Sequence, residues 1–269
     1  MSSKLGNEAK RLVGKNYGKG SGTTQKLVGN IGRIADFMST QGLQSIRDMK
    51  TKHVERFIEK LENDNLSAST RSNYMTAMRE IAHAIGKDNI VPRHNIDLGI
   101  DRSDRYQPKH GDLDKMTDAR DKLYAKDEWL GLACDMAKGF GLRREEALLS
   151  NLVIVKDGQE RIVVAGAKGG RPRDVPIERQ DQKDLVQKVL QYIKDNGQKS
   201  LIPSNLSLKQ GLKKFSNELN RAGATKENMA NLHLYRHEAA QQRDREGKPD
   251  KEIAEYLGHS RESVTQHYK

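Results

Sequence analysis

The first third of the chain carries apolar residues at the spacing of amphipathic helices. Three stripes share this spacing: Leu27, Ile31, Ile34 and Met38, then Val54, Phe57, Ile58 and Leu61, then Tyr74, Met78, Ile81 and Ile85. Side chains three or four positions apart lie on one face of a helix, so each stripe predicts a helix with one buried face. Ser67 and its neighbours before the third stripe are residues that cap a helix N-terminus. We therefore expect a small all-α domain over residues 23–98.

The pattern changes in the second half of the chain. Asp127 is placed to cap a helix that runs to about Lys138, and a break at 139–141 leads into a short helix. Short β-branched runs then predict three strands, at 152–155, 161–164 and 174–177, separated by Asp157-Gly158 and Gly169-Gly170 turns. Helical spacing returns at 181–195, 207–221, 233–246 and 250–257, and in a last segment approaching Tyr268. The fold class expected is mainly α with a small β-sheet, and residues 113–269 are predicted to form an α+β domain.

Two segments lack apolar periodicity. The first twenty residues carry five Lys or Arg against one Glu, so we predict that residues 1–22 are a flexible basic arm. Such an arm either grips phosphates or is a plain disordered tail. The polar stretch 99–112 contains Pro108 and Gly111, and we interpret it as the linker between the two domains.

Composition narrows the class of partner. The formal net charge is +11, with Lys and Arg spread along the whole chain. This distribution favours a long polyanion such as double-stranded DNA over a small acidic ligand, although a protein that is merely basic fits it too. The single cysteine, Cys134, lies in an apolar helical stretch and is predicted to be a buried structural thiol. No run approaches a membrane span and no signal core follows Met1, so we expect a cytoplasmic protein, nucleoid-associated if bacterial.

Five short motifs carry the candidate chemistry. In chain order they are Gly141-Leu142-Arg143 with Glu146, Lys168 before two glycines, His233-x-x-Arg236, Leu257-Gly258-His259, and Tyr268 nine residues after His259. In this order and spacing they closely resemble the tyrosine recombinase (phage integrase) family. Residues 66–74 similarly resemble the core-binding, SAM-like domain found in front of many catalytic domains of that family. The resemblance covers about residues 125–268 well and about 23–86 loosely.

The residue types suit attack on a phosphodiester. Such a group resists nucleophiles because it is already negative, and its transition state spreads more charge over the equatorial oxygens. The planar fork of an arginine binds two of these oxygens and stays protonated, which makes Arg143 and Arg236 the candidate pair. Arg144 is a rival to Arg143, but the family pattern selects Arg143 and Glu146. Glu146 shares a helix face with Arg143 and either orients it or forms a solvent-exposed ion pair.

The resemblance implies roles for the remaining residues. Tyr268 would be the nucleophile, Lys168 the general acid that protonates the departing 5′ oxygen, and His259 a hydrogen-bond partner of a non-bridging oxygen. Arg171 and Arg173 are close enough to compete with Lys168 for its contact. His233 would donate a hydrogen bond or accept the tyrosine proton. His237, at i+4 from His233, also suits a metal pair, but the residue after His233 is leucine and no third ligand is evident.

These features predict a site-specific DNA recombinase or integrase that needs no cofactor and no metal. The resemblance implies a 3′-phosphotyrosyl intermediate, a Holliday junction and a homotetramer on two DNA segments, in the service of a mobile element or phage. Accessory directionality or DNA-bending proteins are possible partners. The sequence ends one residue after Tyr268, where many family members continue with a helix that docks on a neighbouring protomer. Two rival interpretations are a type IB topoisomerase and a DNA-binding regulator that no longer cuts.

Overall fold

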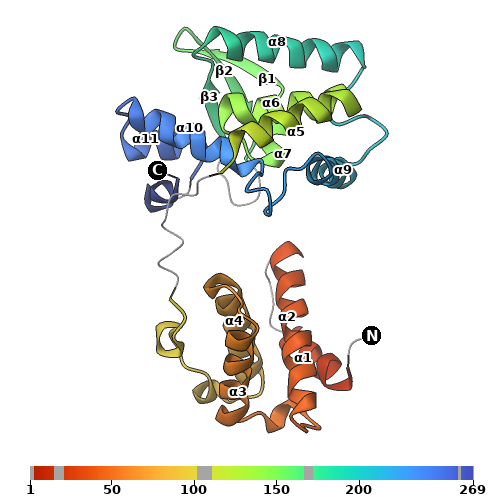
Figure 1. Ribbon diagram of the computed structural model, residues 1–269, viewed down its shortest axis with the longest axis vertical. Helices are drawn as coiled ribbons and strands as arrows, with labels where there is room; N and C mark the ends of the chain where they lie inside the picture. Colours follow the sequence, from red (N-terminus) through yellow and green to blue (C-terminus); the bar gives the residue numbers. More distant parts are fainter. Residues whose placement is uncertain (1–2, 15–20, 102–110, 167–171, 260–261, 269) are drawn as a thin grey trace. The chain divides into compact units, whose positions relative to one another are not determined.

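The computed structural model describes residues 3–14, 21–101, 111–166, 172–259 and 262–268 (Figure 1). The chain divides into two compact units, Met1–Arg105 and Tyr106–Lys269, each with its own hydrophobic core. The described part of the first unit is helical, and the second combines helices with a three-stranded sheet. The expected fold class, mainly α with a small β-sheet, is confirmed.

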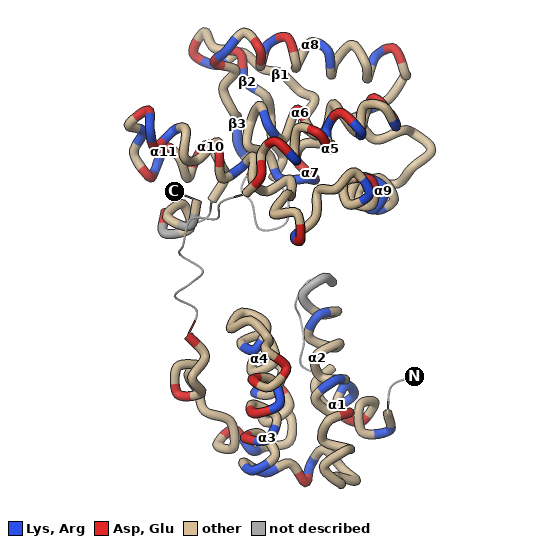
Figure 2. Tube along the Cα trace, in the orientation of Figure 1, with Lys and Arg blue, Asp and Glu red and all other residues tan. Residues whose placement is uncertain are grey.

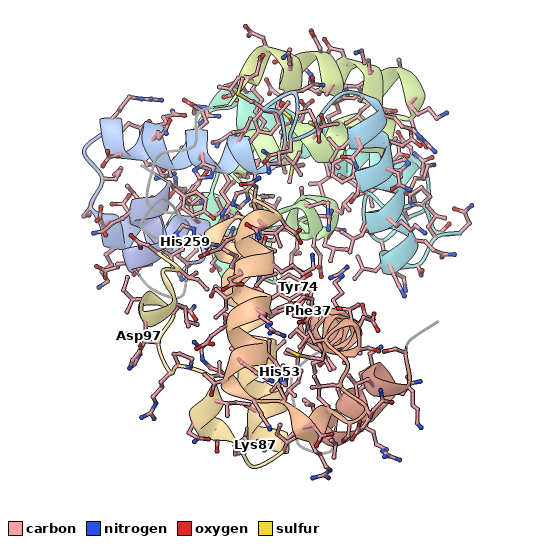
Figure 3. The ribbon with its side chains drawn as sticks, turned by 60° about the horizontal axis from the view of Figure 1, so that its bottom comes forward. Phe37, His53, Tyr74, Lys87, Asp97 and His259 are labelled. Carbon is pink, nitrogen blue, oxygen red and sulfur yellow. The ribbon has the colours of Figure 1, made fainter. Side chains whose placement is uncertain are left out.

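The first unit is built from helices α1 (Lys4–Gly14), α2 (Ser21–Thr40), α3 (Thr51–Asn63) and α4 (Ala68–Ala84). Short 3-10 turns follow α2 and α4: η1 (Ile46–Asp48), η2 (Asp88–Ile90) and η3 (Ile96–Leu98). The three predicted stripes supply much of its core. Phe57 also packs between Phe37 and Tyr74, with ring centroids 5.2 and 5.6 Å away, and the latter two are marked in Figure 3. The α4 N-terminus is capped as predicted, because Ser67 Oγ accepts a hydrogen bond from Thr70 N at 3.3 Å.

The prediction of a flexible arm over residues 1–22 is wrong for Lys4–Gly14, which form α1. Leu5, Ala9 and Val13 recur every four residues, and all three are buried in the core of the first unit. Between them, Glu8 accepts hydrogen bonds from Ser45 Oγ at 2.7 Å and from the backbone N–H of Ile46 at 3.0 Å. The prediction relied on the basic residues of this segment. Its apolar stripe is narrow, but it is sufficient to dock the helix.

The second unit begins with α5 (Leu113–Lys126), α6 (Glu128–Phe140) and α7 (Arg144–Leu149). After the sheet, α8 (Gln180–Asp195), α9 (Leu208–Arg221), α10 (His233–Arg245) and α11 (Asp250–Leu257) follow, and the 3-10 helix η5 (Glu262–His267) leads to Tyr268. Asp127 stands before α6, but it makes no side-chain cap; its carboxylate accepts instead from Trp129 Nε1 at 2.8 Å. Cys134 is fully buried as predicted, and burial raises the pKa of its thiol to about 12.

The sheet is antiparallel, with strands β1 (Leu152–Lys156), β2 (Gln159–Val164) and β3 (Arg173–Pro176) in sequence order. The predicted Asp157-Gly158 turn joins β1 and β2, with both residues at positive φ, 52° and 74°, as a tight hairpin of this twist requires. Ile162, Val164 and Val175 put their side chains into the core. The predicted Gly169-Gly170 turn lies outside the described residues.

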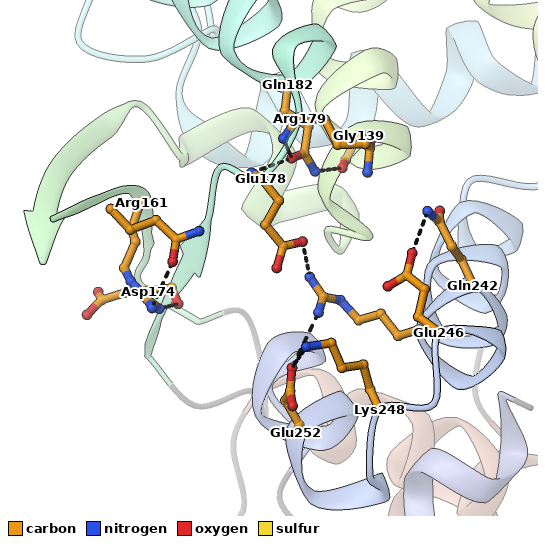
Figure 4. A network of polar contacts seen from close by, with 12 residues as sticks. Gly139, Arg161, Asp174, Glu178, Arg179, Gln182, Gln242, Glu246, Lys248 and Glu252 are labelled. Atoms are coloured by element: carbon orange, nitrogen blue, oxygen red, sulfur yellow. Dashed lines mark hydrogen bonds and ion pairs between the residues drawn. The ribbon is translucent and has the colours of Figure 1, made fainter. Parts of the chain in front are cut away.

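Arg243 joins α10 to α11 and to the segment before α8 through Glu252 and Glu178, which are labelled in Figure 4. Its guanidinium pairs with Glu178 at 2.6 Å and Glu252 at 3.8 Å, and lies 3.5 Å from the centroid of the Tyr256 ring. Only 7% of the side chain is exposed. These contacts tie the C-terminal half of α10 to α11 and to the segment before α8.

Basic and acidic residues are interspersed along the helices of both units (Figure 2). Neither unit therefore accounts alone for the net charge of +11. No described helix is long and apolar enough to cross a membrane.

Candidate active site

Five of the predicted site residues come from four places in the second unit. Arg143 precedes α7, His233 and Arg236 occupy the first turn of α10, His259 follows α11, and Tyr268 follows η5. The structure brings these five together through the contacts given below. Lys168 lies outside the described residues.

Glu146 holds Arg143 at the start of α7. The Glu146 carboxylate accepts from the backbone N–H of Arg143 and from its Nη1, each at 2.9 Å. Arg143 keeps 24% of its side chain exposed, whereas the Glu146 side chain is 1% exposed. The carboxylate is therefore a buried anchor for Arg143 and not a solvent-exposed ion pair.

Arg236 is completely buried between two helix ends. Its Nη1 donates to the carbonyl of Gly141 at 2.9 Å, and its Nη2 donates to the carbonyl of Leu257. Arg143 donates to the Leu257 and Gly258 carbonyls as well, at 3.5 and 3.4 Å. These carbonyls end α6 and α11, where unpaired C=O groups and the helix dipole favour cations. Burial, and then the charges of Arg143 and Arg173, lower the pKa of Arg236 to about 10, so it stays protonated near neutral pH.

Two glycines permit this close packing. Gly141 has φ 59°, and a Cβ there would lie 2.8 Å from the Cβ of Ala239. Gly258 has φ 65°, and a Cβ there would lie 2.7 Å from Arg173 Nη1. Both glycines end helices in the left-handed conformation, which other residues adopt at a cost. Their positions in the Gly-Leu-Arg and Leu-Gly-His motifs thus have a structural reason.

Tyr268 lies among the site's histidines. Its phenol oxygen is 2.9 Å from His233 Nε2. The ring stacks on His237, with centroids 4.4 Å apart and planes inclined by 27°, and its centroid is 4.7 Å from that of His259. Arg236 Cζ lies 5.7 Å from the centre of the same ring. The backbone N–H of Tyr268 donates to the Thr265 carbonyl at 2.9 Å, which fixes the turn that presents the ring.

His259 is buried beside this ring, at the end of α11 (Figure 3). Its Nδ1 is 3.0 Å from the hydroxyl oxygen of Thr265. Burial, and then the positive charges of Arg236 and Arg143, lower the pKa of His259 to about 3, so its imidazole is neutral near neutral pH. His259 Nε2 and Arg236 Nε are both buried without a hydrogen-bond partner among the described residues. Buried polar nitrogens normally have a hydrogen-bond partner, so both are candidates to bind an anionic oxygen.

Comparison with known proteins identifies the family. The sequence profile of the Phage integrase family matches residues 109–269, more than half of the chain. The chain belongs to the phage integrase family. It is a tyrosine-type site-specific DNA recombinase, as its motifs predicted. A second profile, described as Phage integrase, N-terminal, matches residues 1–91. No curated protein matches the chain.

Solved structures of phage integrase relatives share the fold at low sequence identity. The XerH site-specific recombinase, bound to a palindromic difH substrate after cleavage, is 18% identical with a TM-score of 0.68; the match covers 99% of this chain and 81% of that one. A lambda integrase tetramer bound to a Holliday junction is 16% identical with a TM-score of 0.67, covering 100% and 78%. The Tn1549 transposon integrase with transposon right-end DNA is 16% identical with a TM-score of 0.60, covering 99% and 94%. Because these matches cover nearly the whole chain, both units share the fold of these integrase structures.

The structure adds three residues to this phage integrase site that the motifs did not select. Arg173, considered from sequence only as a rival to Lys168, is buried on Glu146. His237, considered as half of a metal pair, stacks on Tyr268. Thr265 is fully buried against His259. The i+4 spacing of His237 from His233 was the one sequence signal among them, because it places both imidazoles on one helix face. The assembled groups are a phenol with a proton acceptor and two arginines, a set that suits attack on a phosphate ester.

Proposed function

We propose that this chain cuts and rejoins duplex DNA through a covalent bond between Tyr268 and a DNA 3′-phosphate. One observation carries the proposal: the Tyr268 phenol oxygen is 2.9 Å from His233 Nε2, next to buried nitrogens of Arg236 and His259 that have no partner among the described residues. A nucleophile beside its proton acceptor, with cationic and neutral donors around it, is what attack on a phosphodiester requires.

In the first step, the phenol oxygen bonds to phosphorus and its proton passes to His233 Nε2. The bond from phosphorus to the 5′ oxygen breaks, and that oxygen takes up a proton to become a 5′-hydroxyl. Lys168 is the proposed donor of this proton, on the strength of the family motif. In the second step a 5′-hydroxyl of the partner strand attacks the phosphotyrosine, and the phenol leaves with its proton restored. One phosphoester replaces another in each step, so the reaction needs no ATP.

Arg143 and Arg236 would stabilise the charge that develops on the equatorial oxygens. Neutral His259 would add a hydrogen bond from Nε2 when the Thr265 hydroxyl donates to Nδ1. Arg236 is completely buried, and the Tyr268 ring is part of its cover. The phosphate therefore reaches Arg236 only if the ring moves aside, and we expect DNA binding to shift the Glu262–Tyr268 segment.

The wider biological role rests on the relatives. We propose assembly as a homotetramer on two DNA segments with a Holliday junction, because the lambda integrase tetramer bound to such a junction shares this fold. Integration or excision of a phage or mobile element is proposed from the family and from the Tn1549 transposon integrase. Accessory directionality or DNA-bending proteins, and a location with the DNA in the cytoplasm or nucleoid, belong to the same proposal.

A trapping assay tests the chemistry. The protein is incubated with a pool of nicked duplexes that includes DNA flanking its own gene, and an SDS-resistant protein–DNA adduct is sought. The nick lets the short strand diffuse away, so the covalent intermediate accumulates. We expect an adduct with the unsubstituted chain and none with Tyr268→Phe. DNA binding without an adduct would favour a non-cutting regulator, and relaxation of any supercoiled plasmid without recombinants would favour a topoisomerase.

A further inference from the structure

Arg173 is the first residue of β3, and its guanidinium is almost fully buried, with 7% of the side chain exposed. All three guanidinium nitrogens have partners. Nη1 and Nη2 donate to the two oxygens of Glu146, each at 3.1 Å, and Nε donates to the carbonyl of Tyr256 at 2.7 Å. Arg173 thus connects the sheet, the first turn of α7 and the last turn of α11, and only 7% of its side chain is exposed for contact with DNA.

Glu146 is shared by two arginines of different exposure. Arg173 forms a two-pronged pair with both carboxylate oxygens, while Arg143 reaches Oε1 with one nitrogen and is 24% exposed. With Arg236, the cluster holds three positive charges against one negative charge, a net charge of +2. If a neutral side chain replaced Arg173, Glu146 would cancel the charge of Arg143. The net charge of the cluster that faces a phosphate would then fall from +2 to +1.

The same guanidinium sets the position of the carbonyls that bind Arg143 and Arg236. Arg173 holds the Tyr256 carbonyl, and the next two carbonyls, of Leu257 and Gly258, accept from Arg143. The guanidinium lies so close to Gly258 that a Cβ there would be 2.7 Å from Nη1. A residue that packs this closely leaves the end of α11 little room to move.

We propose that Arg173 is a positioning residue for strand cleavage, which neutralises Glu146 and fixes the end of α11 so that Arg143 and Arg236 present their charge to the scissile phosphate. This inference rests on the proposed function, since it concerns the rate at which Tyr268 attacks DNA. Arg173 touches neither the DNA nor Tyr268 and acts only through Glu146 and α11.

The test measures the rate of adduct formation at saturating concentrations of the nicked duplex recovered from the trapping assay, together with the Kd for that duplex. We expect Arg173→Gln to cleave about 100-fold more slowly than the unsubstituted chain, because small displacements of catalytic groups cost about this much, with Kd changed less than about threefold. Arg173→Lys keeps the charge but not the fork, and should lose about tenfold. The double variant Glu146→Gln with Arg173→Gln restores a net charge of +2, and should cleave about tenfold faster than Arg173→Gln alone.

Arg243 provides the matched control, because it is equally buried and also contacts Tyr256 on α11, but not Glu146. Arg243→Gln and Arg243→Lys should unfold at lower temperature and yet cleave within about threefold of the unsubstituted chain. If Arg173→Gln does not fold, the Arg173→Lys and Arg243→Lys pair gives the same comparison.

The proposal would be overturned by cleavage within about threefold for Arg173→Lys, or by a double variant no faster than Arg173→Gln. An equal loss in the Arg243 variants would also overturn it, because any loosening of α11 would then suffice. A loss confined to Kd would assign Arg173 to DNA binding instead. Absence of an adduct with the unsubstituted chain would refute the proposed function itself, before any variant is compared.

Discussion

Replacing Glu146 with glutamine leaves two arginines facing an uncharged side chain. The Glu146 side chain is 1% exposed and accepts hydrogen bonds from Arg143 and Arg173. Glutamine has nearly the same shape, but one of its two terminal groups is a donor that would face other donors. The substitution therefore removes the charge and part of the hydrogen bonding without leaving a cavity.

The pKa of Glu146 determines how much free energy of unfolding the substitution should remove. Burial would raise this pKa, but the hydrogen bonds and charges of Arg173 and Arg143 lower it from its ordinary value of 4.5 to about 2. One unit of pKa corresponds to about 1.4 kcal/mol, so ionised Glu146 stabilises the fold by about 3 kcal/mol at pH 7. Because the folded pKa lies below the unfolded one, this stabilisation is complete above pH 4.5 and is lost as the pH falls towards 2. Between pH 7 and pH 4 about 1 kcal/mol should disappear.

Urea unfolding followed by Trp129 fluorescence reports on the second unit, which contains Glu146. Trp129 is the chain's only tryptophan and is fully buried in the core of that unit. Glu146→Gln should lower the free energy of unfolding, followed by Trp129 fluorescence, by about 3 kcal/mol at pH 7 and by about 2 kcal/mol at pH 4.

Glu160→Gln is the control, since Glu160 pairs with Lys183 at 3.1 Å and both side chains are more than 40% exposed. It should change the free energy of unfolding by less than about 0.5 kcal/mol at either pH. A loss below about 1 kcal/mol for Glu146→Gln, or an equal loss at both pH values, would refute the assignment of Glu146 as the ionised anchor of the two arginines.

Three further predictions concern the glycines, His259 and the charge of the chain. Gly258→Ala should lower the free energy of unfolding by about 2 kcal/mol, more than Gly158→Ala, because both have positive φ but only Gly258 also meets a side chain; equal losses would contradict the close approach of Arg173. The pKa of His259 is about 3 in the folded chain and 6.5 in the unfolded chain. Above pH 6.5 this difference does not affect the free energy of unfolding. Below pH 6.5 only the unfolded chain takes up the proton, so the free energy of unfolding falls by up to about 1.4 kcal/mol per pH unit. His259→Asn should remove that slope between pH 6.5 and 4, and parallel pH profiles of the two proteins would count against a buried neutral imidazole. DNA affinity should fall steeply with added salt, because phosphate contacts release counterions; an affinity independent of salt would refute binding through contacts with the phosphates.

Elements with a local signature were predictable from the sequence. The stripe from Leu27 to Met38 gives α2, and Asp157-Gly158 gives the β1–β2 turn, because each pattern needs only its own neighbours. Helix α1 was missed because Lys4, Lys10 and Arg11 gave the segment the character of a basic arm, although Leu5 and Val13 dock it firmly. Helix α5 was missed for a similar reason: only Met116, Ala119 and Leu123 are buried along its fourteen residues.

The motif spacing predicted which residues meet, but not what holds them. His233 and Tyr268 do lie within hydrogen-bond distance, 35 positions apart in sequence. The pairing of Glu146 with Arg173 spans 27 positions and depends on how β3 packs against α7 and α11, which no local pattern encodes. The carbonyls that bind Arg236 belong to the backbone, and since every residue has a carbonyl the sequence does not show which of them accept. The linker over 99–112 and the role of Lys168 stay predictions.

Locating the covalent bond is the most direct test of whether Tyr268 becomes joined to a DNA 3′-phosphate. The adduct trapped on nicked duplex is digested with nuclease and protease, and the modified peptide is sequenced by mass spectrometry. We expect a nucleotide remnant on Tyr268, attached through its 3′-phosphate, and a free 5′-hydroxyl on the released strand. A remnant on another residue, or a linkage through a 5′-phosphate, would contradict this expectation.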